Sequence, residues 1–236
     1  MSNIGVAVIP AKGTSIGIVG KNLQTVGGRT LLERTIDQAQ QAERIDQIFV
    51  VTEDDTIAEL SEKHGATVFR CSAEMSDNRT MAWEKVRLVA ESFKECRGGI
   101  EPLFLELHPT YPFRRPELID ACIGVLSLHK EWDGVLVGSF CHDRVWRKKG
   151  SGFERVNTDI PIKARQYQEP LAIDHFGLCN VYRHALALSG NPYGGKLELY
   201  ISDFNPRQLI DIDTAEDLRL CQAIARDASC KSPPIL

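Results

Sequence analysis

The chain has 236 residues, enough for one large domain with a buried core or for one domain that carries an inserted arm. Its 28 lysines and arginines against 32 aspartates and glutamates give a formal net charge of −4. No long basic run occurs, which argues against a general nucleic-acid-binding protein. Seven cysteines without a CxxC pair favour reduced thiols and a cytoplasmic protein. No segment is apolar enough for a secretory signal or a membrane span.

Short apolar runs alternate with amphipathic segments over the first 139 residues. Buried strands are predicted at 5–9, 47–52, 67–70, 103–107 and 134–139, and helices at 30–43, 55–64, 80–93 and 116–130. This alternation indicates βαβ units and therefore an α/β fold, a three-layer sandwich with a mostly parallel, Rossmann-like sheet. Loops after the carboxyl ends of such strands carry the site, here the loop after 5–9 and residues 52–55 and 108–114.

The regular alternation stops at residues 140–175, which are rich in arginine, lysine, glutamine and proline. We interpret about 140–176 as an inserted arm with short strands, which is either a contact between subunits or a plain surface excursion. Basic residues at 144 and 147–149 would attract an acidic ligand, although such a charge run is more often a solvated face. Helices are expected to resume only at Thr214.

Three known motifs compete for the opening loop IPAKGTSIGIVGKN, residues 9–22. A Walker phosphate loop and a GxGxxG dinucleotide fingerprint both fail, because Ser15 stands where each needs a glycine. A nucleophile elbow, GxSxG, fits residues 13–17, but the next residues are β-branched and broken by glycine, which is poor material for a helix. What remains is an anion cradle of backbone N–H groups with Lys12 and Lys21, or an ordinary glycine-rich connection with surface lysines.

Residues 210–213, IDID, place two carboxylates two positions apart. On a strand, Asp211 and Asp213 would share a face while the isoleucines enter the core. Two neighbouring carboxylates repel each other, and a divalent cation such as Mg²⁺ relieves that repulsion. The alternative is a strand end followed by a helix cap, in which Thr214 and Asp217 form a capping box.

Five segments occur in the order PAKGTSIGIVGKN, VTEDDTIAE, RCSAEMSDNRT, LHPTYPFR and IDIDTAEDL. Together they resemble the motifs of acylneuraminate and related sugar-acid cytidylyltransferases. The resemblance spans about residues 4–223 and so treats residues 1–236 as a single domain. It implies a nucleotidyltransferase fold that activates a nonulosonic-type sugar acid with CTP and Mg²⁺, giving a CMP-sugar and pyrophosphate. It also implies a homodimer in which the arm of one subunit reaches the sugar site of the other.

The resemblance also implies roles for individual residues. The triphosphate would lie on Ala11, Lys12, Gly13 and Lys21, and the cytosine and ribose on Asn22, Arg70 and Thr80. The sugar acid would contact His108, Thr110, Tyr111, Arg165, Gln166 and His175. Asp211 and Asp213 would hold Mg²⁺ over the α-phosphate, and with Lys12 and Lys21 they form the predicted catalytic set. Catalysis would rest on positioning and charge neutralisation, and the sequence names no general base.

Several positions depart from the family pattern. Lys12 replaces an arginine and Ile16 replaces a lysine, and the second change removes a phosphate contact worth about 1.5–3 kcal/mol. His108 replaces a glutamine beside the sugar, and residues 174–177, DHFG, stand where sialic-acid enzymes have RPNG. We therefore predict that N-acetylneuraminate is a poor substrate. The alternatives are a nucleotidyltransferase for another sugar or nucleotide, and a non-catalytic homologue that binds nucleotide sugars.

Overall fold

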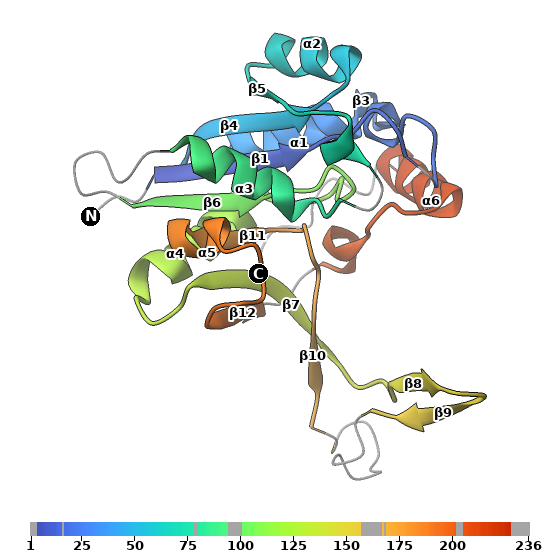
Figure 1. Ribbon diagram of the computed structural model, residues 1–236. Helices are drawn as coiled ribbons and strands as arrows, with labels where there is room; N and C mark the ends of the chain where they lie inside the picture. The colour runs from blue at the N-terminus through green and yellow to red at the C-terminus, as the bar shows by residue number, and fades with distance from the viewer. Residues whose placement is uncertain are drawn as a thin grey trace.

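Eight strands form the central sheet of the computed structural model, which describes residues 4–15, 17–77, 80–93, 101–156, 167, 169–201 and 205–227. The strands are β1 (Ile4–Pro10), β4 (Ile45–Thr52), β5 (Thr67–Arg70), β6 (Pro102–Glu106), β7 (Gly134–Cys141), β10 (Leu171–Asp174), β11 (Asn180–Arg183) and β12 (Leu197–Ile201). Their order is β10-β7-β11-β6-β1-β4-β5, with β12 paired to β7 (Figure 1). β1 is parallel to β4 and β6, and β4 to β5, whereas β11 runs antiparallel between β6 and β7.

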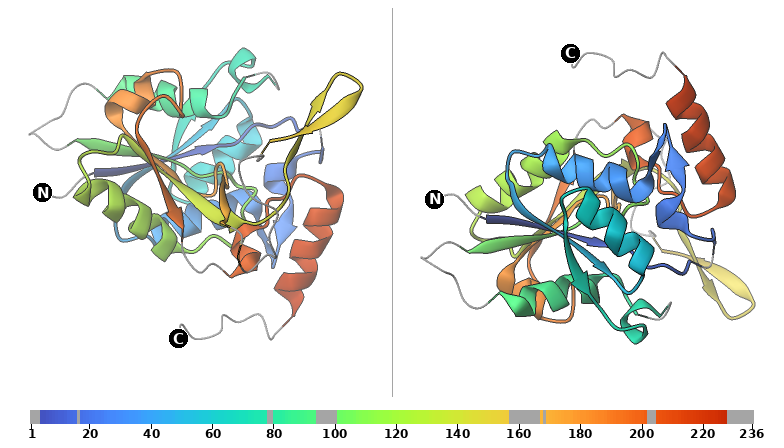
Figure 2. Two further views of the ribbon diagram at one scale, coloured as in Figure 1. Left: turned by 90° about the horizontal axis from the view of Figure 1, so that it is seen from below. Right: turned by 90° about the horizontal axis from the view of Figure 1, so that it is seen from above.

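Helices cover both faces of this sheet, which is the middle of three layers (Figure 2). On one face lie α1 (Leu31–Gln40), α2 (Asp55–Lys63) and α4 (Pro116–Leu128). On the other lie α3 (Trp83–Ser92) and α5 (His184–Leu188). α6 (Ala215–Arg226) packs beside the ribbon of β2 (Thr25–Val26) and β3 (Arg29–Thr30), over a small apolar cluster of its own. The predicted three-layer α/β sandwich with a mostly parallel sheet is confirmed.

Local sequence accounts for these elements. In β1, Ala7 and Ile9 enter the core on one face and Val6 and Val8 the core on the other, so an unbroken apolar run is needed. The Thr30 side chain caps α1 with Glu33 as its capping-box partner. Short 3₁₀ turns, η1 (Lys21–Leu23), η2 (Glu74–Ser76) and η5 (Pro206–Leu209), shape the loops. The predicted strands and helices up to residue 139 are therefore present, with ends shifted by a few residues.

The structure corrects two expectations in the second half of the chain. Helices do not resume only at Thr214, because α5 precedes it; its five residues are too few for a helical period to show. Residues 210–213 form no strand, because Lys21 Nζ donates to the carbonyl of Ile212 at 2.9 Å and the N–H of Ile212 donates to Thr110 at 3.0 Å. Ile212 is nevertheless fully buried, as predicted.

The segment that we interpreted as an arm has two parts. β10 joins the main sheet, antiparallel to the end of β7. β8 (Trp146–Lys149) and β9 (Gly152–Arg155) form a hairpin that projects away from the body of the protein (Figure 1). The basic residues of this hairpin are exposed, as expected for a solvated face.

Two smaller expectations can be compared with the described residues. None of the helices found there has both the length and the apolar character that a bilayer crossing requires. The described cysteines have free thiols, as predicted; they are Cys71, Cys122, Cys141, Cys179 and Cys221.

Candidate active site

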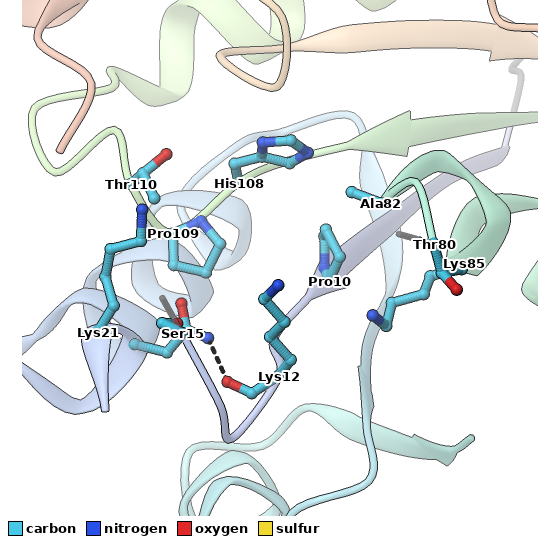
Figure 3. Close-up of a pocket in the computed structure, with 11 residues that line it drawn as sticks. Pro10, Lys12, Ser15, Lys21, Thr80, Ala82, Lys85, His108, Pro109 and Thr110 are labelled. Carbon is cyan, nitrogen blue, oxygen red and sulfur yellow. Dashed lines mark hydrogen bonds between the residues drawn. The ribbon is translucent and has the colours of Figure 1, made fainter. Parts of the chain in front are cut away.

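A pocket of about 160 Å³ opens at the carboxyl ends of β1 and β6 (Figure 3). These strands are neighbours in the centre of the sheet, so the loops that follow them meet. The opening loop, the start of α3 and the loop after β6 line it with Pro10, Lys12, Ser15, Lys21, Asn22, Thr80, Ala82, Lys85, His108, Pro109 and Thr110. Most residues predicted for the nucleotide, and two predicted for the sugar, therefore share one pocket.

Hydrogen bonds to Glu53, after β4, and within the loop itself hold the opening loop in place. Gly13 donates its N–H to Glu53 Oε1 at 2.8 Å, and the Asn22 side-chain amide donates to the carbonyl of Lys12 at 2.9 Å. Burial tends to raise the pKa of Glu53, but hydrogen bonds, from Ser76 and from Gly13 among others, bring it below its usual value. The N–H of Ala11 continues the strand pairing by donating to Val51 at 3.1 Å. A carboxylate thus anchors the loop while Lys12 faces the pocket.

Three lysine side chains line the pocket, and none of its lining residues is acidic. Lys21 donates to Ile212 and also pairs with Asp213 Oδ1 at 3.1 Å, which joins the opening loop to the aspartate segment. Lys85 is only 4% exposed, and its amine donates to the carbonyl of Met75 at 3.3 Å. Burial lowers the pKa of Lys85, and nearby Lys12 adds to that effect. Such a pocket suits a polyanion.

Sequence reasoning missed Lys85, because a lysine on an amphipathic helix is usually solvated. A signal was available. Lys85 stands four residues before Val89 and one before Val86, and both valines are fully buried. A lysine among the buried apolar residues of a helix is unusual. Lys85 lies there and is part of the pocket lining.

Asp213 lies beside the pocket residue Lys21, and Asp211 lies near Tyr111. Asp211 is half-buried, and its Oδ1 has no hydrogen-bond partner among the described residues. The carboxylate of Asp213 is exposed and pairs with Lys21. No group of three or more histidine, cysteine or acidic side chains that could hold a metal occurs in the described part of the chain. Two carboxylates with one orphaned oxygen fit Mg²⁺, which completes its shell with phosphate oxygens and water.

Arg114 ties the loop after β6 to the loop that follows β10. Its guanidinium is buried and donates to Gln38 Oε1 at 3.0 Å, to the carbonyls of His108 at 2.6 Å and Gly177 at 3.1 Å, and to the carbonyl of Leu178. Burial lowers the pKa of Arg114 to about 10. The sequence motif LHPTYPFR contains this residue, but only the structure shows that it positions His108.

Replacing Arg114 by lysine should destabilise the protein by about 3–5 kcal/mol, because one amine cannot replace the planar donor fork and leaves buried carbonyls unpaired. Urea unfolding measures the change in free energy. Arg87→Lys is the matched control, since Arg87 pairs with Glu84 and Glu91 along α3 and its own side chain is exposed. Equal stability of both variants would contradict the role given to Arg114.

His108 is held on several sides. Its Nε2 lies 2.7 Å from Glu106 Oε1, and its ring meets Phe176 edge to face at 5.8 Å. The ring also lies against Gly177, where an added Cβ would come within 2.2 Å of His108 Nδ1. Gly177 has a φ of +83°, so glycine is required there both for space and for backbone conformation.

Other predicted residues that the structure describes, Tyr111, His175 and Arg70, are not part of the pocket lining. Tyr111 is buried and donates to the carbonyl of Phe176 at 3.3 Å; burial raises its pKa, and Asp211 adds to the rise. The His175 ring shares a hydrogen bond with Ser139 at 2.8 Å, and burial lowers its pKa. Arg70 is exposed and pairs with Asp55 at 2.7 Å. Arg165, Gln166 and Ile16 lie outside the described residues.

A comparison with known families agrees with this geometry. The model of the family described as Cytidylyltransferase matches residues 6–132, more than half of the chain. The chain belongs to the cytidylyltransferase family. The matched region contains the whole lining of the pocket, while Asp211 and Asp213 lie beyond it.

The names of individual relatives refer to different sugar acids. CMP-N,N'-diacetyllegionaminic acid synthase of Legionella pneumophila is 31% identical over 52% of this chain and 52% of its own length. A 3-deoxy-manno-octulosonate cytidylyltransferase of Leptospira interrogans is 28% identical over 53% of this chain and 47% of its own. N-acylneuraminate cytidylyltransferase of Escherichia coli is 27% identical over 46% and 25%. The matches thus span about half the length of the relatives or less.

Solved structures extend the likeness to the whole fold. CMP:2-keto-3-deoxy-manno-octonic acid synthetase in complex with CTP superposes with a TM-score of 0.68 at 14% identity, over 93% of this chain and 97% of that one. 4-Diphosphocytidyl-2C-methyl-D-erythritol synthase of Anaerococcus prevotii gives a TM-score of 0.66 at 18% identity, over 94% and 96%. At such identities the likeness shows the fold alone.

Proposed function

We propose that this cytidylyltransferase transfers CMP from CTP to a nonulosonic-type sugar acid and releases pyrophosphate. The observation that carries the proposal is the pocket in which Lys12, Lys21 and Lys85 converge beside Asp211 and Asp213. A triphosphate needs such a concentration of cations, and an α-phosphate under attack needs its charge neutralised. The names of the relatives, which include synthases of CMP-sugar acids, support the acceptor class.

Most polar residues in and beside the pocket then have a task in this reaction. The three lysines bind the triphosphate, and Asn22 and Thr80, which also line the pocket, contact the nucleoside. Asp211 and Asp213 would hold Mg²⁺, which supplies positive charge at the phosphates when bound. His108, Thr110 and Tyr111 orient the sugar acid so that its anomeric hydroxyl faces the α-phosphorus in line. The arrangement works mainly by positioning and charge, as phosphoryl transfer requires.

A pyrophosphate-release assay tests this proposal. The purified protein is mixed with Mg²⁺, each of the four ribonucleoside triphosphates, and a panel of nonulosonic and octulosonic acids. We expect release only with CTP and only when a sugar acid is present. Release with another nucleotide would replace the proposal by a related nucleotidyltransferase, and binding of CTP without any release would favour a non-catalytic homologue.

Within that panel we expect N-acetylneuraminate to have a kcat/KM at least about tenfold below that of the best substrate. The wall beyond His108 carries Phe176, which stacks near Tyr193 at 5.9 Å, and Asp174, which accepts a hydrogen bond from Tyr193 at 2.8 Å. Phe176, Tyr193 and Asp174 carry no positive charge that could bind the carboxylate of the sugar. The highest kcat/KM for N-acetylneuraminate would contradict this reading of the wall.

We further propose that the hairpin of β8 and β9 is the contact of a homodimer. Trp146 and Phe153 lie on the same face of the hairpin and are 56% and 70% exposed. Large apolar side chains on a projecting ribbon are typical of a surface that a partner covers. Trp146→Ser with Phe153→Ser should give a monomer in light scattering. Arg147→Ser, on the opposite face, should leave a dimer, and a monomeric wild-type protein would contradict the proposal.

A further inference from the structure

Glu106 is a buried carboxylate that no part of the nucleotide pocket explains. Its side chain is 0% exposed in the last position of β6, and Oε1 lies 2.7 Å from His108 Nε2. The other oxygen, Oε2, has no hydrogen-bond partner among the described residues. A buried carboxylate is costly unless it is paired, so the imidazole of His108 is its main compensation.

The pairing decides which nitrogen of the His108 ring carries the proton. An ionised carboxylate can only accept a hydrogen bond, so Nε2 must carry the proton that Glu106 binds. In the neutral imidazole, Nδ1 then keeps its lone pair and becomes the proton acceptor. A base oriented by a buried acid is the arrangement that activates hydroxyl groups in many enzymes.

The ring of His108 lies in the pocket lining, where a base could act. Figure 3 shows His108 at the rim of the pocket, above Lys12 and between Thr110 and Ala82. Arg114 fixes its carbonyl, and Gly177 lies against its ring. The imidazole is therefore held on a rigid support beside the proposed phosphate site.

We propose that His108 is the general base of the transfer and that Glu106 is its positioning residue. This inference rests on the proposed function. The anomeric hydroxyl of the sugar acid gives its proton to His108 Nδ1 while its oxygen forms a bond to the α-phosphorus. The bond from the α-phosphorus to the bridging oxygen breaks, and pyrophosphate leaves with that electron pair.

Several titratable groups surround the pair of Glu106 and His108. They are Glu106 itself at the end of β6, Arg114 in the same loop as His108, Tyr182 on β11 near Glu106, Asp174 with Tyr193 beyond Phe176, and the pocket lysines Lys12, Lys21 and Lys85. Of these, Glu106 is the group in direct hydrogen-bond contact with the ring. Of these groups, Glu106 should therefore have the largest effect on the protonation of the His108 ring when it is replaced.

Kinetics as a function of pH test the proposal. His108→Gln should lower kcat about 100-fold or more, with KM for CTP changed less than about threefold, and should remove the acid limb of the pH profile. Glu106→Gln should lower kcat about tenfold or more and shift that limb. His129→Gln is the matched control, because His129 pairs with Glu131 at 3.0 Å on the exposed surface after α4. An unchanged kcat and pH profile in His108→Gln would overturn the proposal.

A second measurement separates this inference from the proposed function. The ¹⁵N shifts of the His108 ring at pH 8 report its tautomer without any turnover. We expect the proton on Nε2 in the wild type and a loss of that preference in Glu106→Gln. A proton on Nδ1 would overturn the dyad even in an active enzyme. A protein that converts no sugar acid would refute the proposed function, and with it the assignment of His108 as base.

Discussion

Replacing Asp211 by asparagine should lower kcat at least about 100-fold, because an amide supplies no charge to a divalent cation, whose contribution to catalysis is several kcal/mol. The fold should remain intact, since Asp211 Oδ1 has no hydrogen-bond partner among the described residues and the two side chains have nearly the same shape. The dependence of the rate on Mg²⁺ concentration should also shift to higher concentrations. Steady-state kinetics across a Mg²⁺ series, with urea unfolding of the same variant, measure both effects.

The control for Asp211→Asn is Glu216→Gln, which removes a carboxylate in the first turn of α6. Glu216 is exposed and pairs with Arg219, away from the pocket. Its replacement should leave the rate and the Mg²⁺ dependence unchanged. Wild-type activity in a folded Asp211→Asn variant would sink the assignment of Asp211 to the metal.

Replacing Lys85 by methionine should weaken CTP binding by roughly 10- to 100-fold, the size expected for a lost charge-assisted contact of about 1.5–3 kcal/mol. The same change should raise the melting temperature. Burial lowers the pKa of Lys85 in the folded state below its unfolded value, so a protonated Lys85 destabilises the fold. That penalty shrinks as pH rises from the lowered pKa towards the ordinary value of 10.5. The difference in stability between Lys85→Met and the wild type should therefore narrow over that range.

Calorimetric titration with CTP and thermal unfolding at several pH values measure the two effects of Lys85→Met together. Lys63→Met, at the exposed end of α2, is the control and should change neither quantity. A gain in stability with loss of binding is the pattern of a residue kept for function. Unchanged CTP affinity in Lys85→Met would remove this lysine from the phosphate site.

The sequence predicted the first half of the fold because its signals there are long and local. The short, β-branched apolar run of β1 indicates a buried strand, and the apolar stripe of α1 indicates a helix. The second half was harder to predict. β11 has four residues and α5 has five, so neither shows a period, and their positions depend on the strands they meet. Residues 210–213 were misassigned because their backbone partners, Lys21 and Thr110, lie far away in sequence.

The candidate site was predictable where a motif marks it. Lys12, Lys21 and His108, which lie in the motifs, line the pocket, while the roles that the resemblance implies for them stay predictions. Lys85 and the Glu106–His108 pair were not predicted, because their importance comes from burial and from neighbours that only the fold supplies. Glu106 is visible in the sequence as a glutamate in an apolar strand. The sequence does not show that the ring of His108 lies 2.7 Å from its carboxylate.

Phosphorus NMR of one reaction mixture tests the central claim most directly. The mixture contains the protein, CTP, Mg²⁺ and the best sugar acid of the panel. The account predicts that the three resonances of CTP are replaced by pyrophosphate and a single phosphodiester, which marks CMP joined to the sugar. Intact CTP in the presence of every sugar acid, from a protein that calorimetry shows to bind CTP, would contradict it.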